Sequence, residues 1–394
     1  MGEVSKKLKS YSLTRSVESR TKTQIKYVHY GDIHTGIAQN ITINNKLPWI
    51  KLDQSKEIEK LKRGDIIVAD ASEDYKGIAD AALIEESLPY NIIAGLHTIA
   101  FRPNNQLMDS KFIFYSLQNI NFKRYGYKIG TGLKVFGISA NNFFNFNLKF
   151  PNILEQNKIS TIINKLKNLL ALYERKLKLL SRVKKYFLDN LFAKKEYPNL
   201  RFKGFTDAWK QRKLSSILIE RKDLSTESKE FPLSSFIQEK GVVPKSQRYD
   251  RSFLVKDSSK KYKVTKFGDF IYSSNNLDTG SIGLNSYGNA VISPVYSVFS
   301  SKNLNVLETN FVNLLFQQNF YKNKMLRFRQ GVMYGQLKIK EDDFLKIRVN
   351  VPSQTEIKNI TNLFSKIESY ATLLENKKKQ LVQIKSILLN TMFI

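Results

Sequence analysis

Two long segments of the chain carry apolar residues at intervals of four and three positions. These residues are Ile159, Ile163, Leu166, Leu170, Tyr173, Leu177, Leu180, Phe187 and Leu191 in the first segment, and Ile360, Phe364, Ile367, Ala371, Leu374, Leu381, Leu388 and Met392 in the second. A mean spacing of about 3.5 residues is typical of helices that pair along a left-handed seam. Lysine interrupts the seam at Lys184, Lys378 and Lys385. The pattern predicts two helices of roughly 40 residues, each about 60 Å long.

The two helical segments belong to an internal duplication. The sequence FPNILEQNKISTIINKL, which begins at residue 150, reappears as VPSQTEIKNITNLFSKI from residue 351. Pro151 therefore matches Pro352, and Glu155 matches Glu356. A repeat of about 200 residues is too long for a solenoid and indicates a duplicated globular domain, each copy followed by a long helix.

The connections predict the direction of the helices. A helix this long cannot bury its apolar stripe against one small domain, and the chain supplies a second helix of matching length. The first helix leaves the first domain and enters the second, so the helix that leaves the second domain must return. We expect an antiparallel pair with one domain at each end, related by a pseudo-two-fold axis. The alternative, in which each helix packs only on its own domain, fits poorly with a seam that spans most of both helices.

The segments before the helices predict mixed α/β domains with many short strands. Gly64-Asp65 and Gly268-Asp269 each close a basic stretch at matching places in the two copies. The predicted strands are residues 65–69, 91–101 and 146–150 in the first copy, and 270–273, 290–299 and 345–351 in the second; the predicted helices are 109–120 and 309–320. The fold class is therefore α+β, with α/β domains at residues 1–150 and 196–351 and long helices at 151–195 and 352–394.

Charge narrows the choice of partner. The 394 residues carry a formal net charge of +29 with 42% hydrophobic residues, so the chain is folded and strongly basic. Nucleic acid is the leading partner and an anionic membrane surface is the competitor. No run approaches eighteen apolar residues, which predicts a protein without a membrane span. The absence of cysteine fits the cytoplasm and excludes thiolate chemistry and zinc fingers.

Motifs for catalysis are missing or weak. The chain contains no G-x-x-x-x-G-K-[ST] phosphate loop and no Asp/Asn-Pro-Pro-Tyr sequence of amino-methyltransferases. His29 and His34 share one segment but have no third metal ligand near them in the sequence. Glu-x-Lys pairs, which nucleases use, occur mostly on the predicted long helices, where side chains two positions apart do not face each other. These pairs are Glu174-Lys176, Glu227-Lys229, Glu356-Lys358 and Glu375-Lys377.

Two glycine-containing basic segments, residues 123–137 and 327–338, are predicted to be loops in contact with DNA. Arginine pairs with guanine and glutamine with adenine in the major groove, while lysine and glycine backbone suit phosphate. The candidates in these loops are Arg124, Tyr125, Lys128, Lys134, Arg327, Arg329, Gln330, Tyr334 and Gln336. Weaker candidates are His34, Lys76, Lys245, Arg248 and Asn275. The alternative is that the glycines only shape a strand connection among solvated charges.

Three features of the chain occur together. They are the order of variable domain, helix, variable domain and helix; the Pro-x-x-x-Glu sequence that opens each helix; and the lead FKGFTDAWKQRKL at residues 202–214. In these features the chain resembles, over almost its whole length, the specificity subunit of type I restriction–modification systems. The first domain departs from the pattern because no segment corresponds to the lead.

The resemblance implies two target recognition domains, each reading one half of a bipartite double-stranded DNA sequence. It also implies that the two helices dock two methyltransferase (M) subunits, which hold S-adenosylmethionine. Restriction (R) subunits, which translocate DNA with ATP and Mg²⁺, can join the complex. The chain itself would hold no cofactor or metal and would catalyse nothing. Its expected role is DNA methylation and defence against foreign DNA in the cytoplasm.

Two other classes of function stay open. A stand-alone basic nuclease or methyltransferase would act on DNA as the purified chain. A coiled-coil scaffold that binds RNA or a membrane would discriminate poorly between DNA sequences.

Overall fold

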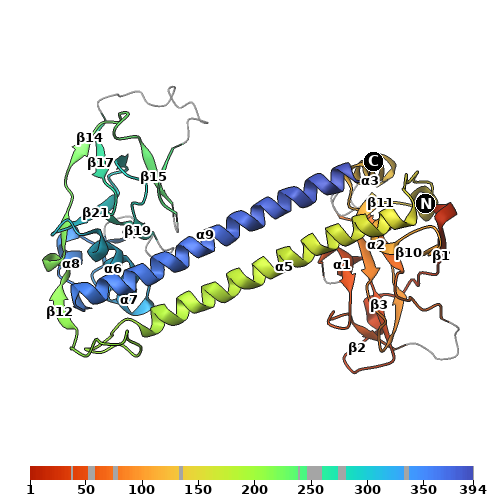
Figure 1. Cartoon of the computed structure of the whole chain (residues 1–394), viewed down its shortest axis with the longest axis horizontal. Helices are drawn as coiled ribbons and strands as arrows, with labels where there is room; N and C mark the ends of the chain where they lie inside the picture. The colour runs from red at the N-terminus through yellow and green to blue at the C-terminus, as the bar shows by residue number, and fades with distance from the viewer. Residues whose placement is uncertain are drawn as a thin grey trace. The chain divides into compact units, whose positions relative to one another are not determined.

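A computed structural model describes residues 1–36, 39–51, 58–73, 79–132, 136–237, 240–245, 260–273, 281–331 and 337–393. The chain forms two compact units. Unit 1 consists of Met1–Glu174 with Glu375–Ile394, and unit 2 is Arg175–Leu374. Each unit contains one globular part and a share of the two long helices, α5 (Ile153–Asn190) and α9 (Gln354–Thr391) (Figure 1).

The globular part of unit 1 is built from short strands and four small helices, three of which come after β10. Its strands are β1 Ser5–Leu8, β2 Glu18–Ser19, β3 Ile25–Val28, β4 Asn40–Ile41, β5 Trp49–Ile50, β6 Ile66–Ala69, β7 Ala71–Ser72, β8 Ala81–Ile84, β9 Asn91–Ala94, β10 Thr98–Pro103 and β11 Phe136–Gly137. Its helices are α1 Tyr30–His34, α2 Ser110–Ser116, α3 Ile120–Ile129 and α4 Ala140–Phe144.

The globular part of unit 2 follows the same plan. Its strands are β12 Lys210–Lys213, β13 Leu218–Glu220, β14 Leu224–Ser225, β15 Ser234–Ile237, β16 Gly241–Pro244, β17 Tyr262–Thr265, β18 Phe270–Ser273, β19 Ile282–Leu284, β20 Ala290–Ile292, β21 Tyr296–Ser301, β22 Gln330–Gly331, β23 Leu337–Lys338 and β24 Arg348–Val351. Its helices are α6 Val306–Phe316, α7 Asn319–Leu326 and α8 Glu341–Leu345.

Strand order shows the duplication directly. In unit 1 the main sheet has the order β1-β10-β6-β8-β4, and in unit 2 the corresponding sheet has the order β13-β21-β18-β19. Neighbouring strands within the shared part of both sheets are antiparallel. Helices α2, α3 and α4 of the first copy correspond in order to α6, α7 and α8 of the second. The α+β prediction is confirmed.

Some predicted strands are wrong in detail. Residues 91–101 form two strands, because the chain turns between β9 and β10, where His97 has a φ of 55°. Residues 290–299 also divide, at a turn that contains Pro294. Residues 146–150 form no strand, whereas the matching β24 pairs with β12, the strand that ends the lead segment. A strand needs such a partner to satisfy its backbone.

The helices α5 Ile153–Asn190 and α9 Gln354–Thr391 pair in antiparallel fashion in both units (Figure 1). The seam residues are all buried or half-buried. In unit 1 the seam residue Lys378 binds Glu174 at 2.9 Å, and in unit 2 Lys184 binds Glu368 at 3.0 Å. Exposed pairs of this kind contribute only about 0.2–1 kcal/mol each. They do place a partner opposite a lysine that would otherwise interrupt the apolar seam.

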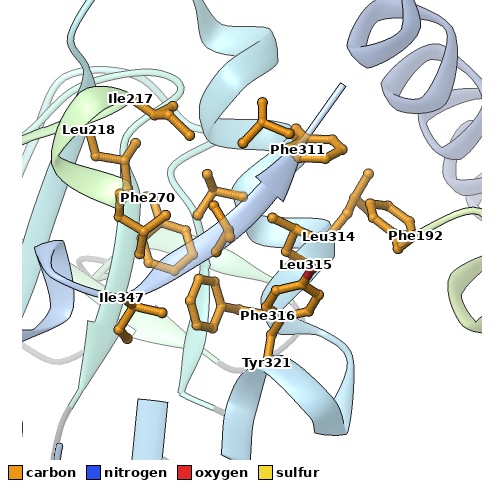
Figure 2. Packing of buried hydrophobic residues seen from close by; sticks show 14 of the residues in the cluster. Phe192, Ile217, Leu218, Phe270, Phe311, Leu314, Leu315, Phe316, Tyr321 and Ile347 are labelled. Carbon is orange, nitrogen blue, oxygen red and sulfur yellow. The ribbon is translucent and has the colours of Figure 1, made fainter. Parts of the chain in front are cut away.

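The ends of the long helices complete the cores of the globular parts. In unit 2, Phe192, which follows the end of α5, packs in the same cluster as Phe311 and Phe316 of α6 (Figure 2). Phe364 near the start of α9 belongs to this cluster too. In unit 1 the roles are exchanged, since Ile159 and Ile163 come from the start of α5 and Phe393 follows the end of α9. Each core therefore depends on both helices.

The repeated Gly-Asp sequence forms a tight turn. The glycine before each aspartate has a positive φ, 91° in the first copy and 84° in the second, which side chains other than hydrogen disfavour. The carboxylate of Asp65 accepts a hydrogen bond from the backbone N–H of Lys62, and Asp269 accepts the same bond from Lys266, both at 2.7 Å. The motif therefore has a structural role in both units.

The carboxylate of this turn is held by arginine in both copies, but from different strands. Asp65 accepts two hydrogen bonds from Arg102 of β10, each at 2.7 Å. Asp269 accepts two from Arg221, which directly follows β13, at 2.7 and 3.0 Å. Bidentate pairing offsets the cost of burying the carboxylate, because both oxygens are satisfied.

Gly241 sits where β16 approaches β19 closely. It has a φ of 73°, and a Cβ at this position would lie 2.3 Å from the carbonyl oxygen of Leu284. We expect Gly241→Ala to destabilise unit 2 by about 1–3 kcal/mol, because the backbone must shift. Urea unfolding measures the change. Gly331→Ala is the control, since an added Cβ there meets no atom of the described residues within 4 Å. A similar loss in both variants would contradict the prediction.

Candidate nucleic-acid interface

The first predicted basic loop is largely a helix. Residues 123–129 lie in α3, which begins after Asn119, whose side chain accepts a hydrogen bond from the N–H of Asn121. The glycine signal is misleading here, because Gly126 is a buried residue inside the helix. Burial of Phe122 on the same helix outweighs the cost of about 1 kcal/mol that a glycine brings to a helix.

The candidate residues on α3 differ in their exposure to solvent. Arg124 and Lys128 are exposed and available to a ligand. Tyr125 instead packs beside Phe146 with ring centroids 5.0 Å apart and donates its hydroxyl hydrogen to the carbonyl of Asn142 at 2.7 Å. The structure therefore gives Tyr125 a packing role within unit 1.

His34 belongs to a polar cluster around Asp80. The carboxylate of Asp80 lies 3.3 Å from Nδ1 of His34 and 2.6 Å from Nζ of Lys123. The other nitrogen of His34 lies 2.9 Å from the carbonyl oxygen of Ala71. Burial favours the neutral form of Asp80, but the bonds to His34 and Lys123 outweigh it and lower the pKa of that carboxyl. Both ring nitrogens of His34 are thus engaged inside unit 1.

All three histidines of the chain gather at Tyr30. The ring of Tyr30 lies 4.4 Å from His29, 5.8 Å from His34 and 5.6 Å from His97, centroid to centroid. In the sequence only His29 and His34 lie near each other. His97 lies in the turn before β10. The described residues contain no cluster of three or more His, Cys, Asp or Glu side chains suited to a metal ion.

The second basic segment contains the short hairpin of β22 and β23. Arg327 caps the end of α7 and is exposed, while Arg329 is half-buried. Gln330 donates from its side-chain amide to Asp343 at 3.0 Å, so its amide is already engaged in unit 2. Burial, and then the charge of Arg327, lower the pKa of Lys324 on the same helix. Arg327 is the candidate that the structure leaves most accessible here.

Of the remaining DNA-contact candidates, only Lys245 is among the described residues. Lys245 is exposed just after β16, and its backbone N–H donates to the carbonyl of Leu233. Six candidates lie outside the described residues: Lys76, Lys134, Arg248, Asn275, Tyr334 and Gln336.

The DNA-contact candidates predicted from the sequence do not include the basic strand β12. Every side chain of β12 is exposed, including Lys210, Arg212 and Lys213. Among the described strands, β12 pairs with β24. Three basic residues within four positions are visible in the sequence, but they fall in the lead segment, and their exposure is known only from the structure.

Comparison with known proteins identifies the fold. The chain has the fold of the S subunit of type I restriction–modification systems. It is similar to the S subunit from M. genitalium, with 12% identity over 100% of this chain and 94% of that chain and a TM-score of 0.59. It is also similar to a chain from a structure of complex assembly and conformational transition of the type I R-M system, with 13% identity, coverage of 92% and 90%, and a TM-score of 0.52. No protein-family model and no curated protein matches the sequence.

The described helices give no sign of a membrane segment. None of them is both long enough and apolar enough to cross a bilayer.

Proposed function

We propose that this chain is the DNA-specificity subunit of a type I restriction–modification complex. The observation that carries the proposal is the shared fold over the full chain, in which two α/β units are each completed by both long helices. The net charge of +29 supports a polyanionic partner. Double-stranded DNA is the ligand that joins these two observations.

Each globular part would read one half of a bipartite target. The two parts share their sheet order but differ outside it, as expected of one scaffold adapted to two sequences. The long helices would dock two M subunits, and R subunits would join that complex. Methylation would use S-adenosylmethionine held by the M subunits, and restriction would use ATP and Mg²⁺ held by the R subunits. This chain would contribute recognition and no catalysis.

Comparison of DNA methylation in the host with and without this gene tests the proposal. We expect one bipartite methylated motif to disappear when the gene is deleted and to return with a plasmid copy. Unchanged methylation would contradict the proposal. Nuclease or methyltransferase activity of the purified chain would favour the stand-alone enzyme. Equal binding of unrelated duplexes would favour the scaffold.

Arg327→Ala should relax recognition at one base pair of one half-site. An exposed arginine that pairs bidentately with guanine contributes about 1–3 kcal/mol of discrimination. The measurement is binding of the full chain to the specific duplex and to duplexes substituted at each position. A loss that is equal for specific and random duplexes would assign Arg327 to a phosphate instead.

A further inference from the structure

Unit 2 contains a basic cavity of about 590 Å³ where α5 meets the globular part. Strands β16 and β19 and helices α6, α7 and α9 contribute the other walls. Four lysines line it: Lys184, Lys185, Lys240 and Lys322.

The cavity has an excess of positive charge. Among the described residues that line it, the one acidic side chain is Glu368, which binds Lys184 at 3.0 Å. That pair leaves the charges of Lys185, Lys240 and Lys322 without a carboxylate in the lining. Such a site favours an anion, because a bound anion removes repulsion between the lysines as well as adding attraction.

Neutral groups in the lining suit an oxyanion. Gly241 and Gly283 bring backbone to the wall without side chains, and Ser286 adds a hydroxyl. The side-chain oxygen of Asn313 is buried and accepts no hydrogen bond from the described residues. Half a turn of that amide would present its N–H donors instead. Lysines with glycine backbone and small polar donors are the usual surroundings of a phosphate.

Unit 1 carries a related charge cluster at the matching place in the repeat. Lys167 of α5 corresponds to Glu368 of α9, and Lys385 of α9 corresponds to Lys184 of α5. Glu85 corresponds to Ser286 through strand register, because each lies two residues after the partner of the first hydrophobic residue in the Gly-Asp turn strand, Leu83 opposite Ile66 and Leu284 opposite Phe270.

The unit 1 cluster is also positive in excess. Lys111 binds Glu85 at 3.3 Å, and Lys167 lies close enough to interact with Glu85 and Lys385. Burial, together with the charges of Lys385 and Lys111, lowers the pKa of Lys167 despite Glu85. Three lysines thus share one glutamate.

We propose that these two basic sites each hold a backbone phosphate of duplex DNA, and this rests on the proposed function. The sheets repeat between units while the surrounding loops diverge. Both sites lie where the long helices meet the repeated sheet, so a group of the DNA that both could hold must be independent of sequence. Phosphate meets that requirement, whereas bases do not.

The triple variant Lys185→Gln, Lys240→Gln and Lys322→Gln tests the unit 2 site and keeps the pair of Lys184 with Glu368. The control removes three exposed lysines of unit 2 outside the cavity, by Lys302→Gln, Lys358→Gln and Lys366→Gln. Full chains are compared by titration with the methylated-motif duplex and with a random duplex across a series of salt concentrations.

We expect the cavity variant to bind both duplexes about fivefold more weakly at 0.15 M salt for each phosphate that it no longer neutralises, with a salt slope shallower by about 0.9. Its base preferences should stay unchanged, and the control should keep the full slope. The double variant Lys167→Gln and Lys385→Gln should lower the affinity and the salt slope in the same way through the unit 1 site.

Three outcomes would overturn the proposal. They are unchanged binding by both site variants, a loss confined to the specific duplex, and weakened assembly with methyltransferase subunits at unchanged DNA affinity. If the wild-type chain shows no sequence preference but the site variants still show a shallower slope, the phosphate sites stand and the specificity function fails.

Discussion

Replacing Arg201 with methionine is expected to destabilise unit 2 by about 3–5 kcal/mol. Arg201 precedes the lead segment and donates two hydrogen bonds of 2.8 Å to Glu356, at the start of α9. The side chain of Glu356 is 1% exposed. Without Arg201 its carboxylate remains buried with no positive partner, and this costs more than the bonds themselves contribute.

Tryptophan fluorescence during urea unfolding measures this effect in unit 2 alone. Trp209 is buried in the same core cluster as Ile357, which follows Glu356, so a Trp49→Phe background leaves a reporter in unit 2. The control is Glu227→Gln in unit 2, because Glu227 is exposed and its variant is read by the same tryptophan. That variant should change stability by less than about 0.5 kcal/mol. A loss below about 1 kcal/mol for Arg201→Met would show that the buried carboxylate finds another partner.

Exchange of residues 1–150 for the corresponding domain of another member of the same family should change one half of the methylated motif completely and leave the other half intact. The two globular parts have separate cores, and each would contact its own half-site. The readout is the methylated motif in cells that carry the hybrid chain. Exchange of residues 196–351 should alter only the opposite half. New bases in both halves after either exchange would contradict the assignment of one half-site to each domain.

The long helices could be predicted because their signal is local and repeated. Seam spacing depends on residues within one segment, and every seam position is buried or half-buried. The lysines in the seam appeared to be interruptions. The carboxylate that binds a seam lysine from the other helix, such as Glu174 for Lys378, can be identified only when the register between the two helices is known.

The candidate site was harder to predict because glycine has more than one use. Glycines in residues 123–137 suggested a loop, yet Gly126 is a buried residue inside α3. Burial of neighbouring aromatic residues decides this, and burial depends on contacts far apart in the sequence. Lys240 and Lys322 of the cavity were missed for the same reason, since they come from segments far apart in the sequence.

The division of unit 1 between the two ends of the sequence sets an order of events during synthesis. Its core needs Phe393, which the ribosome adds only after the whole of unit 2. At about 5–20 residues per second, the roughly 200 residues of unit 2 delay that addition by about 10–40 s. During this interval Ile159 and Ile163 lack part of their apolar cover, while unit 2 already has its complete sequence. The part of the chain that is made first is therefore the last to finish folding.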